Sequence, residues 1–139
     1  MSQDWIDANE QDEYLIDYLF DLNGYVVIKN GLANQDLDEM NQWIDNHWQY
    51  IEGNRRNNNE DQGQWIGHVE THTYSDADGC NFQNIIEAGS VFRRLITYPT
   101  WIEHCRRWIN PVNGISIHEN LINVRGQSGY IGIHCGGAL

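Results

Sequence analysis

Apolar residues recur every three or four positions in several stretches of the chain, and this spacing predicts helices. The first helix begins near Tyr14 and ends at Gly24, because glycine favours the position that follows a helix. The second helix is the clearest, with an apolar stripe over residues 37–51. Asn34 or Asp36 is its expected N-cap, since short polar side chains accept hydrogen bonds from the first N–H groups of a helix.

A third helical pattern covers residues 91–109 and contains a proline. The residue before a proline is disfavoured in helical geometry, so this region is expected to form two helices with a corner at Tyr98-Pro99. Residues 1–13 are polar, and no regular structure is expected there before the first helix.

Strands are predicted where apolar residues alternate or are β-branched. The expected strands are 24–29, 65–74, 115–124 and 130–133, and the expected turn-rich segments are 53–64 and 75–81. The order of elements predicts an α+β fold, with helices in front of a sheet that begins only near the end of the chain. One or two terminal strands cannot bury their faces alone, so the sheet is expected to be incomplete. Its exposed edges could pair with another chain, and the oligomeric state stays open.

Composition narrows the class of protein. The chain has 139 residues, of which 40% are hydrophobic, and this suits a single domain over 1–139 with a real core. The net charge of −12 disfavours nucleic acid and anionic membranes as partners. The acidic N-terminal residues lack the apolar segment of a signal peptide, so none is expected, and no apolar run approaches roughly 18 residues. Three widely spaced cysteines indicate reduced thiols, and we expect a cytoplasmic protein.

The candidate metal ligand is His134, at the end of the last predicted strand and before two glycines. Imidazole suits Fe(II), and the glycines permit close approach. The alternative is a structural histidine at a strand end. Cys135 has no evident base beside it and is expected to be inert.

Two further groups of polar residues are weaker candidates for a functional site. His68, Glu70 and His72 would share one face of a strand, but alternate side chains stand roughly 7 Å apart, which is wide for one small ion. A solvated strand face is therefore expected. His118 and Glu119 are adjacent, so on a strand they would point to opposite faces, and we interpret them as structural.

The arginines are mostly paired in sequence, as Arg55-Arg56, Arg93-Arg94 and Arg106-Arg107. On so acidic a protein these side chains are expected to pair with Asp and Glu on helix surfaces. Arg125 stands alone in the predicted turn before the last strand, and it is the best candidate for contact with an anionic substrate or cofactor.

Three segments resemble the N-terminal half of the phytanoyl-CoA dioxygenase family. They are FDLNGYVVIKNGL at Phe20–Leu32, FRRLITYPTWI at Phe92–Ile102 and IGIHCGG at Ile131–Gly137. The resemblance implies N-terminal helices packed on a double-stranded β-helix (jelly roll), here incomplete. It also implies an oxidoreductase that uses Fe(II), 2-oxoglutarate and O2 to hydroxylate a small molecule, with His134 as the first iron ligand.

The chain departs from the family pattern after His134. The position expected to carry Asp or Glu is occupied by Gly136. Some halogenating relatives carry glycine at this position. The other interpretation is that the chain is a divergent or metal-free member of the family, and we favour it. The distal histidine and the arginine that binds 2-oxoglutarate lie, in the family, beyond residue 139. We therefore expect no catalytic residue within this chain and no turnover by it as a fragment. The alternatives are a non-catalytic jelly-roll protein and an α+β interaction domain.

Overall fold

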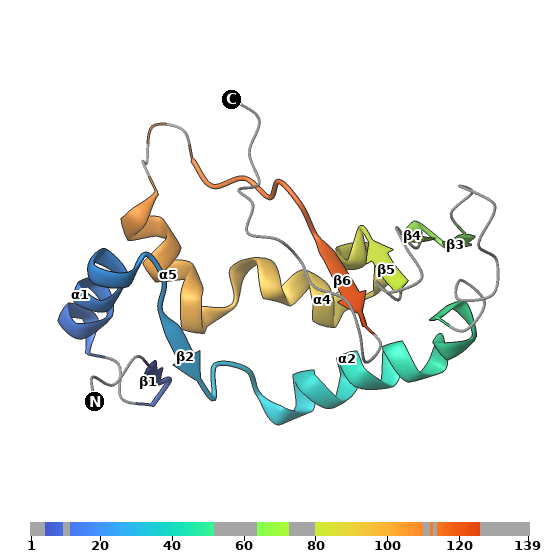
Figure 1. Ribbon diagram of the computed structural model, residues 1–139, viewed down its shortest axis with the longest axis horizontal. Coiled ribbons are helices and arrows are strands. Elements are labelled where there is room, and N and C mark those ends of the chain that lie inside the picture. The colour runs from blue at the N-terminus through green and yellow to red at the C-terminus, as the bar shows by residue number, and fades with distance from the viewer. Residues whose placement is uncertain are drawn as a thin grey trace.

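The computed structural model describes residues 5–9, 12–51, 64–72, 80–109, 112 and 114–125. Within these ranges the elements follow one another as a mixed α+β arrangement (Figure 1). The helices are α1 (Glu13–Asn23), α2 (Asn34–Asn46), α4 (Ser90–Arg94) and α5 (Pro99–Trp108), with 3-10 turns η1 (Ile85–Ala88) and η2 (Leu95–Thr97). The strands are β1 (Trp5–Asp7), β2 (Val27–Lys29), β3 (Gln64–Ile66), β4 (Val69–His72), β5 (Cys80–Gln83) and β6 (Leu121–Val124).

The first helix forms where the sequence predicts it, and its two ends explain why. Asp12 accepts hydrogen bonds from the backbone N–H groups of Tyr14 and Leu15, which caps the N-terminus. Gly24 follows the helix with φ +75°, a left-handed conformation that glycine adopts without strain. The buried residues of α1 are Ile16 and Leu19. The predicted apolar stripe was therefore only partly correct, because Tyr14, Leu15 and Tyr18 are exposed.

The N-terminal segment contains a strand that the sequence did not indicate. β1 pairs in parallel with β2, with Ile6 opposite Ile28. Asp7 fixes the adjacent turn, because its carboxylate accepts hydrogen bonds from the Asn9 backbone at 2.9 Å and from the Asn30 amide at 2.6 Å. These bonds lower the pKa of Asp7, the backbone bond from Asn9 most. The expectation of no regular structure before α1 was wrong here, since the strand is formed by a distant partner.

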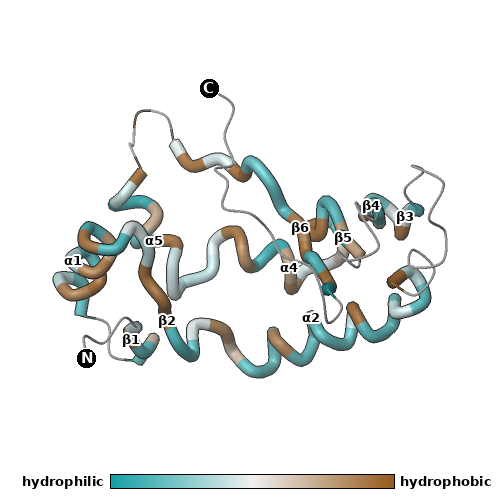
Figure 2. Tube along the Cα trace, in the orientation of Figure 1, coloured by the Kyte–Doolittle hydropathy of each residue, from teal (hydrophilic) through white to brown (hydrophobic). Residues whose placement is uncertain are grey.

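The largest core lies where α2 and α4 pack on one face of the antiparallel sheet β3-β4-β5-β6 (Figure 1). Its most buried side chains include Phe82 and Phe92, and the Trp43 ring of α2 meets both edge-on, at centroid distances of 5.3 and 5.6 Å. Apolar and polar turns alternate along α2 in Figure 2, as this one-sided packing requires. Ile51 completes the core and is fully buried.

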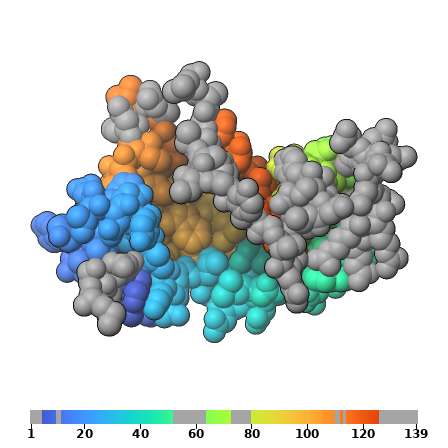
Figure 3. All heavy atoms as spheres, in the orientation of Figure 1, coloured from blue at the N-terminus to red at the C-terminus, as the bar shows by residue number. Residues whose placement is uncertain are grey.

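A second, smaller core joins α1 to α5 at the opposite end of the molecule from the β3–β4 hairpin (Figure 3). Phe20 and Trp108 stack with their ring centroids 3.9 Å apart. Asp17 accepts hydrogen bonds from Arg107 and from the Trp108 indole, each at 2.9 Å, and these bonds lower its pKa. The corner between η2 and α5 lies at Tyr98-Pro99, as predicted.

Three predicted strand regions differ from the structure. Residues 65–74 do not form one strand, because Gly67 adopts φ +61° and turns the chain between β3 and β4. Cys80–Gln83 was expected to lie partly in a turn, and it is instead the most buried strand. Only Leu121–Val124 of the predicted long strand is a strand. Ile115 and Ile117 are each 45% exposed, and they line an apolar hollow of about 640 Å³ beside α5.

The α+β class is thus confirmed, while the four-stranded sheet begins earlier in the chain than expected. Cys80 and Cys105 are reduced thiols. None of the helices in the described ranges combines the length and apolarity needed to cross a membrane.

Candidate functional site

The two faces of the antiparallel sheet differ in chemistry. Successive residues of a strand point to opposite faces, and residues directly opposite one another on neighbouring strands share a face. Val69, Thr71, Cys80 and Phe82 are buried toward α2 and α4. The other side, which we call the polar face, carries Glu70, His72, Asn81, Gln83 and Asn123.

One row of the polar face crosses three strands. His72 of β4 lies opposite Asn81 of β5, and Asn81 lies opposite Asn123 of β6. Asn81 is only 2% exposed, which is unusual for an amide side chain. A buried amide must form hydrogen bonds to offset its desolvation, so its partners are informative.

Those partners form a directed chain of hydrogen bonds that starts at Arg125. The Arg125 Nε group donates to Asn123 Oδ1 at 2.9 Å, and Asn123 Nδ2 donates to Asn81 Oδ1. An arginine can only donate, so it sets the orientation of both amides. The Asn81 Nδ2 group is then left as a donor, with no acceptor among the described residues. The half-buried Arg125 is held through its Nε group.

Arg125 differs in this respect from most other arginines of the described ranges. Arg94 pairs with Asp36 and Glu39, Arg106 pairs with Glu103, and Arg107 pairs with Asp17 and Glu13. The prediction that the paired arginines neutralise carboxylates on helix surfaces is confirmed for Arg94, Arg106 and Arg107. Arg93 has no ion pair with a described residue, and Arg55 and Arg56 lie outside the described residues. No carboxylate within the described ranges pairs with Arg125. A fixed guanidinium without a carboxylate partner is suited to bind an external anion through two parallel hydrogen bonds.

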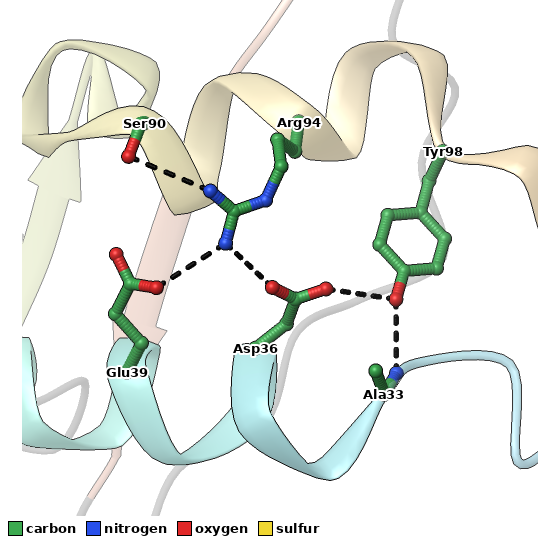
Figure 4. Close-up of polar contacts among 6 residues, drawn as sticks. All are labelled: Ala33, Asp36, Glu39, Ser90, Arg94 and Tyr98. Carbon is green, nitrogen blue, oxygen red and sulfur yellow. Dashed lines mark hydrogen bonds and ion pairs between the residues drawn. The ribbon is translucent and has the colours of Figure 1, made fainter.

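The contacts of Arg94 show what a structural arginine looks like in this protein (Figure 4). One terminal nitrogen lies 2.5 Å from Asp36 Oδ1 and 3.2 Å from Glu39 Oε2, and the other lies 3.5 Å from Ser90 Oγ. The hydrogen bond from Arg94 is the main cause that lowers the pKa of Asp36, followed by the bond from Tyr98. Arg94 thereby joins α4 to the N-terminal turn of α2.

The other sequence candidates are dispersed. His68 lies in the turn between β3 and β4, so it does not share a strand with Glu70 and His72, which do lie on one face. His118 and Glu119 are exposed and lie in irregular structure before β6, so the expected strand geometry does not apply to them. His134, Cys135 and Gly136 lie outside the described residues.

The described ranges do not contain an iron site. No three His, Cys, Asp or Glu side chains there come together closely enough to hold a metal ion. The polar face offers His72 and Glu70 as potential ligands, but their other neighbours are amides, which are poor ligands for Fe(II). The donor set of this face therefore fits an organic anion better than it fits a metal.

Sequence reasoning missed Asn81 and Asn123, although a signal was present. Asn123 interrupts the apolar run Leu121–Val124, and asparagine is depleted from strands. A polar residue inside a strand pattern indicates either a solvated face or a paired polar site. Only the register, which places Asn81 opposite Asn123, distinguishes these two cases.

Comparison of this chain with protein-family models, with curated proteins and with solved structures finds no match. The polar face and Arg125 are therefore the main basis for a functional proposal. The resemblance of the sequence to one oxygenase family is the second basis.

Proposed function

We propose that this chain is the N-terminal part of an Fe(II)/2-oxoglutarate oxygenase of the phytanoyl-CoA dioxygenase type, and that Arg125 binds the carboxylate of a small-molecule anion. The observation that carries the proposal is the hydrogen-bonded chain from Arg125 through Asn123 to the buried Asn81. A jelly roll uses one face of each sheet for packing and the other for ligands. The polar face, opposite the helix-covered core, fits that division.

The geometry explains why Arg125 suits this role. Its Nε group is already bonded to Asn123, so part of the rotamer entropy of the side chain is lost before the ligand arrives. Within the described residues, the terminal nitrogens of Arg125 have no carboxylate partner and can form a bidentate contact with a carboxylate. The Nδ2 donor of Asn81, which has no acceptor among the described residues, adds a second positive dipole on the same face. A small organic dicarboxylate is thus drawn to this part of an otherwise acidic protein. In the family another arginine, beyond residue 139, binds 2-oxoglutarate itself, so at Arg125 this acid serves as a probe for an anionic substrate.

The iron site belongs to a different part of the proposal. We assign the first ligand to His134, on the resemblance of the sequence, while the described residues alone do not fit a metal. What the described residues contribute is anion binding, orientation of the ligand by the two amides, and a rigid wall that rests on the Phe82 and Phe92 core.

Calorimetric titration with 2-oxoglutarate tests the anion site. The unaltered chain is expected to bind it, and Arg125→Gln is expected to weaken binding by about tenfold or more, because a bidentate charged hydrogen bond is lost. Arg93→Gln is the matched control, since Arg93 is an exposed arginine on α4. Equal weakening by both variants, or no binding by the unaltered chain, would overturn the proposal.

The iron assignment has a separate test. In the longer protein of which this chain would be the N-terminal part, Fe(II)-dependent formation of succinate from 2-oxoglutarate should be lost in His134→Ala, while anion binding at Arg125 should survive. If that longer protein binds the anion but forms no succinate, the alternative function is favoured, a non-catalytic protein that binds a small anion. Gly136 supports this alternative, because it stands at the position where the family usually has a carboxylate ligand.

A further inference from the structure

A second hollow lies away from Arg125, where the β3–β4 hairpin meets η1. It has a volume of about 450 Å³ and is lined by Trp65, His68, Asn84, Ile86 and Glu87. This volume lies within the range of about 300–1,000 Å³ typical of small-molecule sites. The lining residues come from two separate stretches of the chain, so the hollow exists only in the folded protein.

The indole of Trp65 lines one side of the hollow. Trp65 pairs with Glu70 across the hairpin, and the tight turn at Gly67 holds it in place. It is 58% exposed, whereas tryptophan is usually mostly buried. A large, rigid ring that is held by a hairpin and open to solvent is a suitable stacking platform for a ligand.

The opposite side of the hollow is built by a constrained turn. Asn84 follows β5 with φ +58°, and its backbone carbonyl accepts a hydrogen bond from the Glu87 N–H at 2.9 Å. Asn120 accepts from the Ile86 N–H through its side chain at 3.2 Å and from the Ile85 N–H through its backbone at 3.3 Å. These bonds use the N–H groups at the start of η1, and they fix the backbone that carries Asn84 and Glu87.

The chemistry of the lining selects the ligand. Trp65 and Ile86 are apolar, while His68, Asn84 and Glu87 present donors and acceptors around them. Among the described residues, the lining has one carboxylate and no lysine or arginine, on a chain of net charge −12, so an anion is disfavoured. Strong recognition of an alkylammonium group uses several aromatic rings, and the described part of this lining has one indole. What fits is a neutral ring with C–H groups on its face and hydroxyls on its edge.

We propose that this hollow binds a neutral sugar ring, stacked on Trp65 with its hydroxyls bonded to Asn84 and Glu87. The site does not involve Arg125, so the sugar-binding proposal is independent of the proposed anion site. Single-ring contacts of this kind bury little surface, and an affinity of about 1–10 mM is expected for a monosaccharide.

Saturation-transfer NMR with methyl glycosides of glucose, galactose, mannose and N-acetylglucosamine tests the proposal. At least one glycoside should receive saturation and shift the Trp65 indole N–H resonance. Trp65→Ala should weaken its binding by about tenfold, whereas Trp65→Phe should retain part of it. Trp48→Ala is the matched control, because Trp48 is also exposed, at 44%, and is not among the described residues that line the hollow. Trp65→Ala folding is checked by circular dichroism, and Trp65→Phe keeps the test valid if that variant unfolds.

Three results would overturn the proposal. The first is that no glycoside binds the unaltered chain. The second is that Trp65→Ala and Trp48→Ala weaken binding equally. The third is that tetramethylammonium, but none of the glycosides, shifts the Trp65 indole resonance, which would make the hollow a cation site.

Discussion

Tyr98 donates a hydrogen bond from its hydroxyl to Asp36 Oδ2 at 2.8 Å, although 62 residues separate the two in sequence. The same hydroxyl accepts a hydrogen bond from the Ala33 backbone N–H at 2.9 Å (Figure 4). No side chain of α2 caps its own N-terminus. The expectation that Asn34 or Asp36 caps this helix was therefore wrong, because Asp36 bonds to Arg94 and Tyr98 while a residue from another element satisfies the backbone.

The Tyr98 contact predicts a specific loss of stability. Tyr98→Phe removes the hydroxyl, so the Ala33 N–H and Asp36 each lose a partner, and the free energy of unfolding should fall by about 1 kcal/mol or somewhat more. Urea denaturation followed by circular dichroism measures this change. Tyr14→Phe is the control, since the Tyr14 side chain is 90% exposed, and it should leave the midpoint unchanged. A midpoint for Tyr98→Phe equal to that of the unaltered chain would contradict this role.

Asp36 also predicts a response to acid. The hydrogen bond from Arg94, and then that from Tyr98, lowers the folded-state pKa of Asp36 below its ordinary value of 3.8. Ionised Asp36 therefore stabilises the folded protein. This contribution is complete above the pKa that Asp36 has in the unfolded chain, and it is lost as the pH falls through the lower pKa that Asp36 has in the folded protein. Between pH 5 and pH 2, Asp36→Asn should show a smaller decrease of the urea midpoint than the unaltered chain. Asp38→Asn, on the exposed side of α2, should behave like the unaltered chain.

His104 predicts a second pH effect, at higher pH. Its ring is 5% exposed, and burial, followed by the charge of Arg107, lowers its pKa below the ordinary value of 6.5. Arg107 donates to His104 Nδ1 at 2.9 Å, so Nδ1 carries no proton, and the neighbouring carboxylates Asp17 and Glu13 offset only part of the shift.

The folded protein therefore binds this proton less tightly than the unfolded chain does, and stability should decrease as the pH falls below about 6.5. His104→Gln keeps an acceptor for Arg107 and should flatten the urea midpoint between pH 7.5 and pH 5. His118→Gln, an exposed histidine, should not. An identical pH profile for His104→Gln and the unaltered chain would refute the assignment.

Asn123 should matter for both stability and ligand binding. Asn123→Ala removes the donor to the buried Asn81 and the acceptor for Arg125, which should cost about 1–3 kcal/mol in the free energy of unfolding. It should also weaken 2-oxoglutarate binding, because Arg125 is no longer held. Asn46→Ala, at an exposed position of α2, should change stability by less than about 0.5 kcal/mol. Unchanged 2-oxoglutarate affinity in Asn123→Ala would show that Arg125 needs no such support.

Removal of one carbon from an isoleucine side chain should affect stability according to how deeply that side chain is buried. Ile51→Val removes one methylene from a fully buried side chain and should reduce the free energy of unfolding by about 1 kcal/mol. Ile115→Val removes the same group from a side chain that is 45% exposed, so chemical denaturation should show little change. Equal effects of the two variants would contradict the placement of the core.

Several features of the fold were predictable because they depend on local chain physics. Gly24 ends α1 by adopting a left-handed conformation, and Pro99 forces the corner after η2. The predicted apolar stripe correctly placed Met40 and Ile44 against the core, but Leu37 is 38% exposed and Ile51 lies beyond the end of α2. In each case the deciding interactions lie within a few residues of one another.

The pairing of strands depended on tertiary structure. β1 is a strand because Ile6 finds Ile28 beside it, and Cys80–Gln83 is a strand because β4 and β6 flank it. Backbone hydrogen bonds between strands connect residues that are distant in sequence, so short segments do not encode them individually. Residues 115–117 show the converse, since an apolar alternation without a paired neighbour among the described strands remained irregular.

The candidate site likewise has features that can be read from the sequence and features that depend on strand pairing. The separation of Arg125 from the helix-surface arginines can be read from the amino-acid sequence, because composition and spacing are local properties. That Arg125 is held by Asn123, and that Asn123 lies opposite the buried Asn81, depends on how distant strands pair. A shift of β6 by one residue relative to β5 would turn Asn123 into the core and leave Arg125 without its support.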